Sequence, residues 1–123
     1  MYSPQVLDHF EHPRNAGEVP DADASVQVEN PACGDILRLT AKISDGRIAA
    51  IRFRAKGCVP SMAFASLLTE MVQGRTLAEA RQLRREQLVA AAGSLPPASI
   101  HASHLALDAL SALLKKLAKD SHQ

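Results

Sequence analysis

Residues 36–58 read ILRLTAKISDGRIAAIRFRAKGC, and this segment predicts the central part of the fold. Apolar and polar residues alternate over 36–43, which is typical of a half-buried β-strand. The apolar face consists of Leu37, Leu39, Ala41 and Ile43. The tripeptide SDG at 44–46 predicts a turn with a glycine for positive φ, and alternation resumes over 47–55. We therefore predict an antiparallel hairpin made of these two strands.

The chain before the hairpin predicts one more strand and one helix. Residues 25–29 alternate in the same way and predict a short strand. Residues 2–10 have apolar side chains at helical spacing, with Ser3 as a suitable N-cap and Pro4 as a suitable first helical residue. Residues 14–23, which hold Asn, Gly and Pro, predict a loop. Together with the hairpin, this gives a small three-stranded antiparallel sheet.

The chain after the hairpin changes to helical spacing. We predict a helix over 60–73, a short helix over 77–83 and another over 85–92. The second of these begins with a capping box, in which Thr76 is the N-cap and Glu79 reaches back to it. Several helices therefore follow the strands.

A last, long helix follows a break. Residues 94–99 include two prolines and should not be helical. The long helix opens at Ser99 or Ile100, and its end, 120–123, should fray. Its buried stripe is predicted to be Leu107, Leu110, Leu114 and Leu117. Strands first and helices later indicate an α+β fold, with the small sheet packed against several helices and residues 1–123 forming a single domain.

The composition predicts an aliphatic core and excludes some kinds of partner. Aromatic residues make up 3% of the 123 residues and Trp is absent, so the core must be built from Leu, Ile, Val and Ala. A net charge of +1, from 14 basic and 13 acidic residues, gives no electrostatic reason to expect binding to nucleic acid or to a membrane surface.

The sequence also indicates a location. No apolar run approaches the ~20 residues needed to span a bilayer, and residues 1–10 lack the basic and then apolar order of a secretory signal. Two cysteines in such a chain are expected to be thiols rather than a disulfide. We therefore expect a reducing, cytoplasmic location.

Four residues at predicted element boundaries form a candidate metal site. Cys33, Asp35, Cys58 and His101 offer two thiolates, a carboxylate and an imidazole, which suit a soft or borderline metal. Cys33 and Asp35 are two residues apart, so an extended backbone would point both side chains the same way. Gly34 between them leaves room for a ligand. The alternative is a loop with a turn-forming aspartate and a small apolar cysteine.

Cys58 and the histidines have alternatives of their own. Cys58 directly precedes a predicted helix, whose N-terminus favours a thiolate; otherwise it is a half-buried cysteine at a strand-to-helix corner. His101 falls in the first turn of the last helix, where a neutral, metal-binding imidazole is preferred. We expect His104 to be a plain surface residue, and His9 and His12 to be exposed to solvent.

At these residues the sequence resembles the iron–sulfur cluster assembly scaffolds, the family of IscU and of the N-terminal domain of NifU. The resemblance covers nearly the whole chain. It rests on HFEHPRNAG (9–17), PACGD (31–35), IRFRAKGC (51–58), LLTEMVQGRTLAEA (67–80), LPPASIH (95–101) and LALDAL (105–110). The resemblance implies that Cys33, Asp35, Cys58 and His101 hold a [2Fe–2S] cluster or iron, or Zn²⁺ in the isolated protein. It also implies a cysteine desulfurase and apo iron–sulfur proteins as partners.

The chain departs from the family pattern at three places. A third cysteine ordinarily stands where this chain has Ala102, and alanine can neither ligate metal nor carry a persulfide. Residues 95–99 read LPPAS instead of the family's LPPVK, which weakens the expectation of an Hsp70-type chaperone as a partner. Val59 and Pro60 replace a small, glycine-containing stretch after Cys58, and Phe64 follows; both changes could narrow access to the thiolate.

Three functions follow from these observations. The first is a scaffold, not an enzyme, that holds a cluster or metal ion and passes it to apo-proteins. The second is a degenerate paralogue that binds Zn or Fe and regulates a cysteine desulfurase without assembling clusters. The third is a thiol hydrolase with Cys58 as nucleophile, His101 as base and Asp35 orienting the base. We expect the first.

Overall fold

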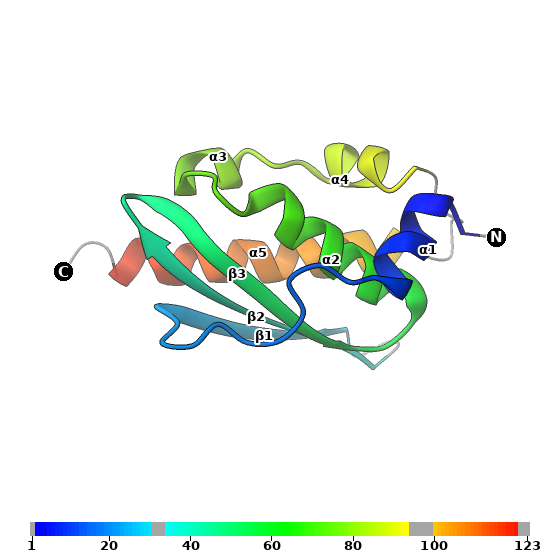
Figure 1. Ribbon diagram of the computed structural model, residues 1–123, viewed down its shortest axis with the longest axis horizontal. Helices are drawn as coiled ribbons and strands as arrows, with labels where there is room; N and C mark the ends of the chain where they lie inside the picture. The colour runs from blue at the N-terminus through cyan, green and yellow to red at the C-terminus, as the bar shows by residue number, and fades with distance from the viewer. Residues whose placement is uncertain (1, 31–33, 94–99, 121–123) are drawn as a thin grey trace.

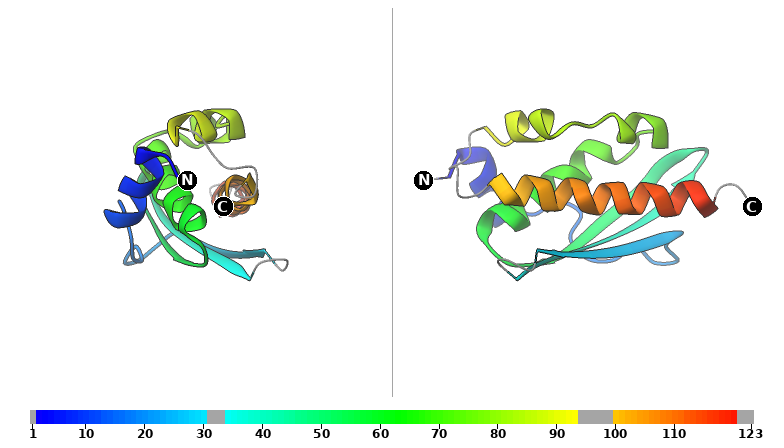
Figure 2. Two further views of the ribbon diagram at one scale, coloured as in Figure 1. Left: turned by 90° about the vertical axis from the view of Figure 1, so that its right-hand side faces the viewer. Right: turned by 180° about the vertical axis from the view of Figure 1, so that it is seen from behind.

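Three layers make up the part of the chain that the computed structural model describes, residues 2–30, 34–93 and 100–120. The helices are α1 (Pro4–Glu11), α2 (Val59–Val72), α3 (Leu77–Arg81), α4 (Arg85–Ala91) and α5 (Ile100–Asp120). A sheet forms the first layer, α2 and α5 cover one of its faces, and α3 and α4 lie over these two helices (Figures 1 and 2). α1 packs beside α2. No helix in these three ranges is both long and apolar enough to cross a membrane.

The sheet has the three strands that the alternation predicts. β1 (Ala24–Asn30), β2 (Asp35–Ser44) and β3 (Arg47–Lys56) pair antiparallel in the order β1-β2-β3. The predicted α+β class and the three-stranded sheet are therefore confirmed. β1 and β2 face α5, whereas β3 faces α2.

The predicted apolar face of β2 is buried except at its end. Leu37, Leu39 and Ala41 are at most 1% exposed. The pairing register shifts between Lys42 and Ile43, because β3 has one extra residue at this point. Ile43, beyond this shift, is half-buried and packs against the core. The predicted apolar face is therefore present, and its burial decreases at Ile43.

The predicted capping residues are found at the starts of α1 and α3. The Ser3 hydroxyl accepts a hydrogen bond from the backbone N–H of Val6, and the Thr76–Glu79 capping box is present in both directions. α3 ends at Arg81 rather than at residue 83. The predictions for residues 94–99 and 121–123 lie outside the described residues.

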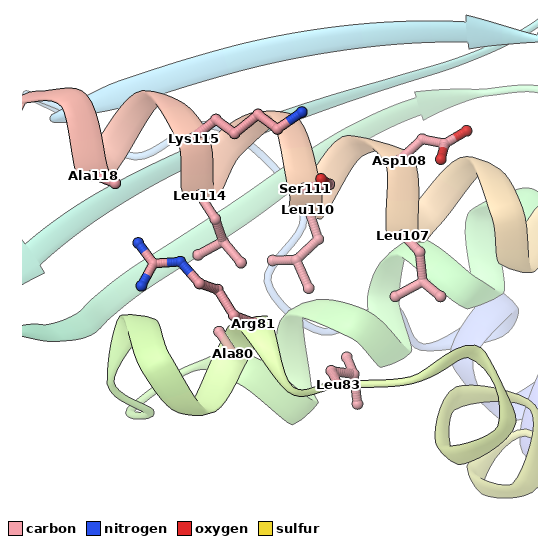
Figure 3. A pocket seen from close by; sticks show the side chains of 10 residues that line it. All are labelled: Ala80, Arg81, Leu83, Leu107, Asp108, Leu110, Ser111, Leu114, Lys115 and Ala118. Atoms are coloured by element: carbon pink, nitrogen blue, oxygen red, sulfur yellow. The ribbon is translucent and has the colours of Figure 1, made fainter.

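α5 buries a wider face than the predicted stripe, because it packs against the sheet, α2 and the upper helices. Leu110, Leu114 and Leu117 are buried as predicted, and Leu113 joins them. Leu107 is only half-buried, so its place in the stripe is wrong. Its side chain lines a groove of about 500 Å³ that is bounded mainly by α3 and α5 (Figure 3).

Candidate metal centre

Three of the four predicted ligands come together at one end of the molecule. Asp35 is the first residue of β2, Cys58 is the N-cap of α2, and His101 lies in the first turn of α5. The first turns of α2 and α5 and the first residues of β2 meet at the right-hand end of Figure 1. One carboxylate oxygen, the thiol sulfur and one imidazole nitrogen all lie within 4.8 Å of one another. Three elements that are distant in sequence therefore converge through their starting residues.

The Asp35 carboxylate is buried and held from two sides. The residue is 3% exposed. Its Oδ2 accepts a 2.5 Å hydrogen bond from the hydroxyl of Ser61. Its Oδ1 faces the α-carbon of Gly57, where an added Cβ would lie 2.2 Å from that oxygen. Gly57 has a φ of +154°, which glycine adopts more readily than other residues, and its missing side chain leaves room for the carboxylate.

Cys58 and His101 face the same carboxylate oxygen. The Cys58 sulfur lies 3.4 Å from Asp35 Oδ2 and 3.9 Å from His101 Nε2. His101 Nε2 lies 3.5 Å from the same Oδ2. Bond lengths of about 2.0–2.3 Å at a tetrahedral ion place neighbouring donors about 3.3–3.8 Å apart. The three donors therefore fit a soft or borderline metal ion without large movement.

The open side of this cluster is the histidine side. The side chain of His101 is 34% exposed, whereas that of Asp35 is 4% exposed. Cys58 is of intermediate exposure and makes no side-chain capping bond to its own helix. The sulfur and the imidazole are thus available to an incoming ligand, while the carboxylate forms the floor.

Cys33, the fourth predicted ligand, lies outside the described residues. The neighbouring backbone corrects one expectation, because Gly34 has a φ of +72° and is not extended. Its N–H bonds to the carbonyl of Asn30, since the chain must reverse between the paired residues Asn30 and Asp35. The backbone at Gly34 therefore does not meet the condition of that expectation, and the position of Cys33 relative to Asp35 stays a prediction.

Sequence reasoning missed Ser61. Its hydroxyl lies 2.5 Å from Asp35 Oδ2 and 3.2 Å from the Cys58 sulfur. The signal was its position three residues after Cys58 at the start of a helix, a spacing at which side chains are neighbours. Ala102, where the resemblance implies a third cysteine, is 1% exposed and belongs to the hydrophobic core.

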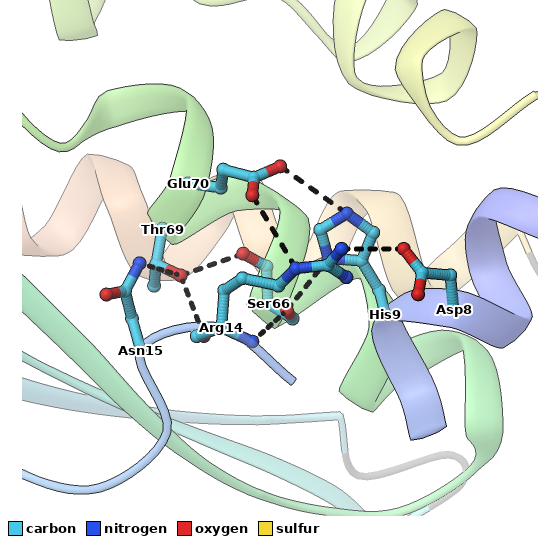
Figure 4. Close-up of polar contacts among 7 residues, drawn as sticks. All are labelled: Asp8, His9, Arg14, Asn15, Ser66, Thr69 and Glu70. Carbon is cyan, nitrogen blue, oxygen red and sulfur yellow. Dashed lines mark hydrogen bonds and ion pairs between the residues drawn. The ribbon is translucent and has the colours of Figure 1, made fainter. Parts of the chain in front are cut away.

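A second polar cluster, between α1 and α2, overturns the prediction that His9 is exposed (Figure 4). His9 is 7% exposed, and its Nδ1 lies 2.8 Å from the Ser66 hydroxyl. Its Nε2 lies 3.5 Å from Glu70, which also pairs with Arg14. His9 falls on the face of α1 that packs against α2, and this packing buries it. His12 and His104 are exposed, as predicted.

The buried His9 predicts that the free energy of unfolding falls in mild acid. Burial, helped by the nearby Arg14 guanidinium and opposed by Glu70 and Asp8, holds the pKa of His9 below its ordinary value of 6.5. The folded state therefore favours the neutral ring, and the unfolded chain binds the proton more readily. Stability should be constant above about pH 6.5 and fall below it, by at most about 1.4 kcal/mol per pH unit for this group.

Urea unfolding measured between pH 8 and pH 5 checks this prediction. His9→Asn should flatten the acid slope, whereas the exposed control His12→Asn should leave it as in the wild type. Equal slopes in all three proteins would mean that His9 does not set the acid sensitivity.

Comparison with known proteins finds sequences that are similar over most of this chain. The family model described as NifU-like N terminal domain matches residues 1–122. Iron-sulfur cluster assembly scaffold protein IscU of Azotobacter vinelandii is 42% identical over 118 residues, which are 93% of this chain and 91% of that protein. The protein named IscU 1 of Archaeoglobus fulgidus is 44% identical over 110 residues, 89% of this chain and 72% of that protein.

The fold is also shared with a solved structure. The N-terminal part of a NifU-like protein from Brucella abortus superposes with a TM-score of 0.76 over 95% of this chain and 94% of that chain. The two sequences are 18% identical, so this likeness concerns the fold alone.

Proposed function

The chain belongs to the family of NifU-like N-terminal domains, and we propose that it is an iron–sulfur cluster assembly scaffold that holds a [2Fe–2S] cluster or iron and passes it to apo-proteins. The observation that carries the proposal is the convergence of Asp35, Cys58 and His101 on one point. Iron and sulfide are cargo here, so the site has to bind them and also release them.

Each proposed ligand has a role that its surroundings support. Cys58 supplies a thiolate for iron, and Asp35 supplies a carboxylate that is fixed before the cargo arrives. His101 supplies an imidazole from the open side. We propose Cys33 as the fourth ligand, because it is the chain's other cysteine and the family resemblance implies a cysteine ligand at its position. Zn²⁺ would suit the same donors in the isolated protein.

A site with two cysteines should release its cargo readily. Replacing thiolate by imidazole on iron raises the reduction potential of a cluster, and Ala102 offers no donor. The exposed edge of His101 gives the cargo a way in and out. We propose that a cysteine desulfurase supplies the sulfur, that apo iron–sulfur proteins receive the cluster, and that the protein works in a reducing, cytoplasmic compartment that keeps Cys58 a thiol.

The geometry disfavours a thiol hydrolase. In a Cys–His–Asp triad the histidine uses one ring nitrogen toward the nucleophile and the other toward the orienting carboxylate. Here the Cys58 sulfur and Asp35 Oδ2 both approach Nε2 of His101. This arrangement suits three ligands of one ion better than a proton relay.

Metal and sulfide analysis tests the proposal. The protein is purified without added zinc, reconstituted anaerobically with Fe²⁺, cysteine, a cysteine desulfurase and a thiol reductant that reduces the delivered sulfur to sulfide, and desalted. We expect iron and acid-labile sulfide in equal amounts, with the visible absorption of a cluster. Iron without sulfide would favour the degenerate paralogue instead, and neither iron nor sulfide would overturn both.

The alanine at position 102 favours the degenerate paralogue. The substitution Ala102→Cys distinguishes this function from that of a scaffold. If the wild type is a scaffold, its sulfide content should be similar to that of Ala102→Cys. If it is a degenerate paralogue, only the variant should gain sulfide. Because Ala102 is 1% exposed, the added sulfur should lower the free energy of unfolding by about 1–3 kcal/mol. Ala102→Ser places an oxygen where the sulfur would be but supplies no thiolate, so it is the control for a polar substitution at this buried position.

A further inference from the structure

We propose that Ser61, which is not itself a ligand, is the positioning residue that fixes the Asp35 carboxylate for metal binding and raises the affinity of the site. This inference rests on the proposed function, because it concerns how the same site takes up its metal. Nothing in the resemblance or in the ligand set points to Ser61. The inference comes from the contacts of its hydroxyl.

One hydroxyl group touches two of the proposed ligands. Ser61 is 4% exposed and lies in the first turn of α2, three residues after Cys58. Its oxygen is 2.5 Å from Asp35 Oδ2 and 3.2 Å from the Cys58 sulfur. A serine hydroxyl has one proton to donate and two lone pairs. It therefore donates to the carboxylate while its lone pairs remain available to a neutral thiol.

The bonded oxygen is the one that matters for the metal. Oδ2 is the oxygen that faces both the Cys58 sulfur and His101 Nε2. The torsion that sets a carboxylate plane is broad and roughly two-fold, so by itself it does not hold one oxygen in place. Oδ1 lies where a Cβ at Gly57 would clash with it, and the hydrogen bond from Ser61 holds Oδ2 toward the other donors. Ser61 thus fixes the orientation of the carboxylate before a metal arrives.

The hydrogen bond from Ser61 has two opposing effects on the metal affinity of the site. We expect its effect on the orientation of the carboxylate to be the larger one. Donation from Ser61 withdraws some charge from Oδ2, which weakens it as a donor. However, a carboxylate oxygen has room for a hydrogen bond and a metal at the same time. Loss of such an outer-shell partner typically lowers metal affinity by about 10–100-fold. We therefore expect the hydroxyl to raise the affinity of the site.

Cobalt titration of the intact protein tests this inference. Zinc-free protein is titrated anaerobically with Co²⁺ in competition with a chelator, and the visible ligand-field and thiolate-to-cobalt bands are recorded. Ser61→Ala should bind about 10–100-fold more weakly than the wild type, with altered ligand-field bands. Ser66→Ala is the matched control, since Ser66 is a buried serine of the same helix that bonds to His9 and Arg14 instead. Its cobalt affinity and spectrum should be unchanged.

A second comparison asks whether Ser61 acts through Asp35. In an Asp35→Ala background, adding Ser61→Ala should cause no further loss of cobalt affinity, because the group being positioned is already gone. This pair also removes the buried carboxylate that would lose the hydrogen bond from Ser61, so it remains informative if Ser61→Ala alone folds poorly. A further loss in this background would overturn the inference.

The outcomes separate this inference from the proposed function. If the wild type binds no cobalt with thiolate character, the proposed site fails. If the wild type binds cobalt and Ser61→Ala binds it equally or more tightly, the site stands and the role of Ser61 is overturned. Weaker binding by Ser61→Ala, with Ser66→Ala unchanged, supports it.

Discussion

Cys58→Ala should abolish retention of iron and sulfide after reconstitution and remove the thiolate-to-cobalt band that Cys58 contributes. The sulfur lies 3.4 Å from Asp35 Oδ2 and 3.9 Å from His101 Nε2, so it completes the cluster of donors. Losing a ligand should lower cobalt affinity by more than the about 10–100-fold expected for loss of an outer-shell partner. Iron and sulfide analysis and cobalt titration measure the two effects.

The loss should not come from unfolding. Cys58 makes no side-chain capping bond to α2 and is not fully buried. The urea midpoint of Cys58→Ala should therefore stay close to that of the wild type. Cys58→Ser, which keeps the shape but supplies a poor ligand for iron, should lose iron and sulfide in the same way. Wild-type iron and sulfide in either variant would remove Cys58 from the site.

Local patterns predicted most of the fold because local physics sets them. The alternation over 36–55 and the turn at 44–46 produce the β2–β3 hairpin, and Thr76 with Glu79 produces a complete capping box. In each case the residues that determine the structure are a few positions apart. The α+β class then follows from the order of the elements.

The misses arise where distant segments pack. The burial of His9 depends on α2, and the partial exposure of Leu107 depends on the gap between α3 and α5. Neither contact has a signature in the residues around the side chain. The positive φ of Gly34 also depends on a partner strand, because Asn30 of β1 pairs with Asp35 of β2 and the chain has to reverse between them.

The candidate site was only partly predictable for the same reason. Asp35, Cys58 and His101 could each be placed at the start of an element, and their donor chemistry suggested a metal. Their convergence needed the family resemblance or the structure, since nothing local brings residues 35, 58 and 101 together. The hydrogen bond from Ser61 to Asp35 joins residues 26 positions apart, and no local sequence pattern predicts it.

Gly57→Ala should damage both the fold and the site, because Gly57 forms one wall of the Asp35 carboxylate. An added Cβ would lie 2.2 Å from Oδ1 and 2.6 Å from Cγ of Asp35, and the φ of +154° is strained for any other residue. The backbone strain costs about 1–3 kcal/mol, and displacing the buried carboxylate from its donor costs about 1–3 kcal/mol more. We expect a clearly lower urea midpoint and weaker cobalt binding.

Gly46→Ala is the matched control for Gly57→Ala. Gly46 also has a positive φ, +72°, but an added Cβ there meets nothing within 4 Å. It should therefore lower the free energy of unfolding through backbone strain alone and leave cobalt affinity unchanged. Adding Asp35→Ala to Gly57→Ala removes the clashing carboxylate and should recover part of the lost stability but none of the cobalt affinity. If Gly57→Ala binds cobalt as tightly as the wild type, the carboxylate does not need the position in which Gly57 and Ser61 hold it.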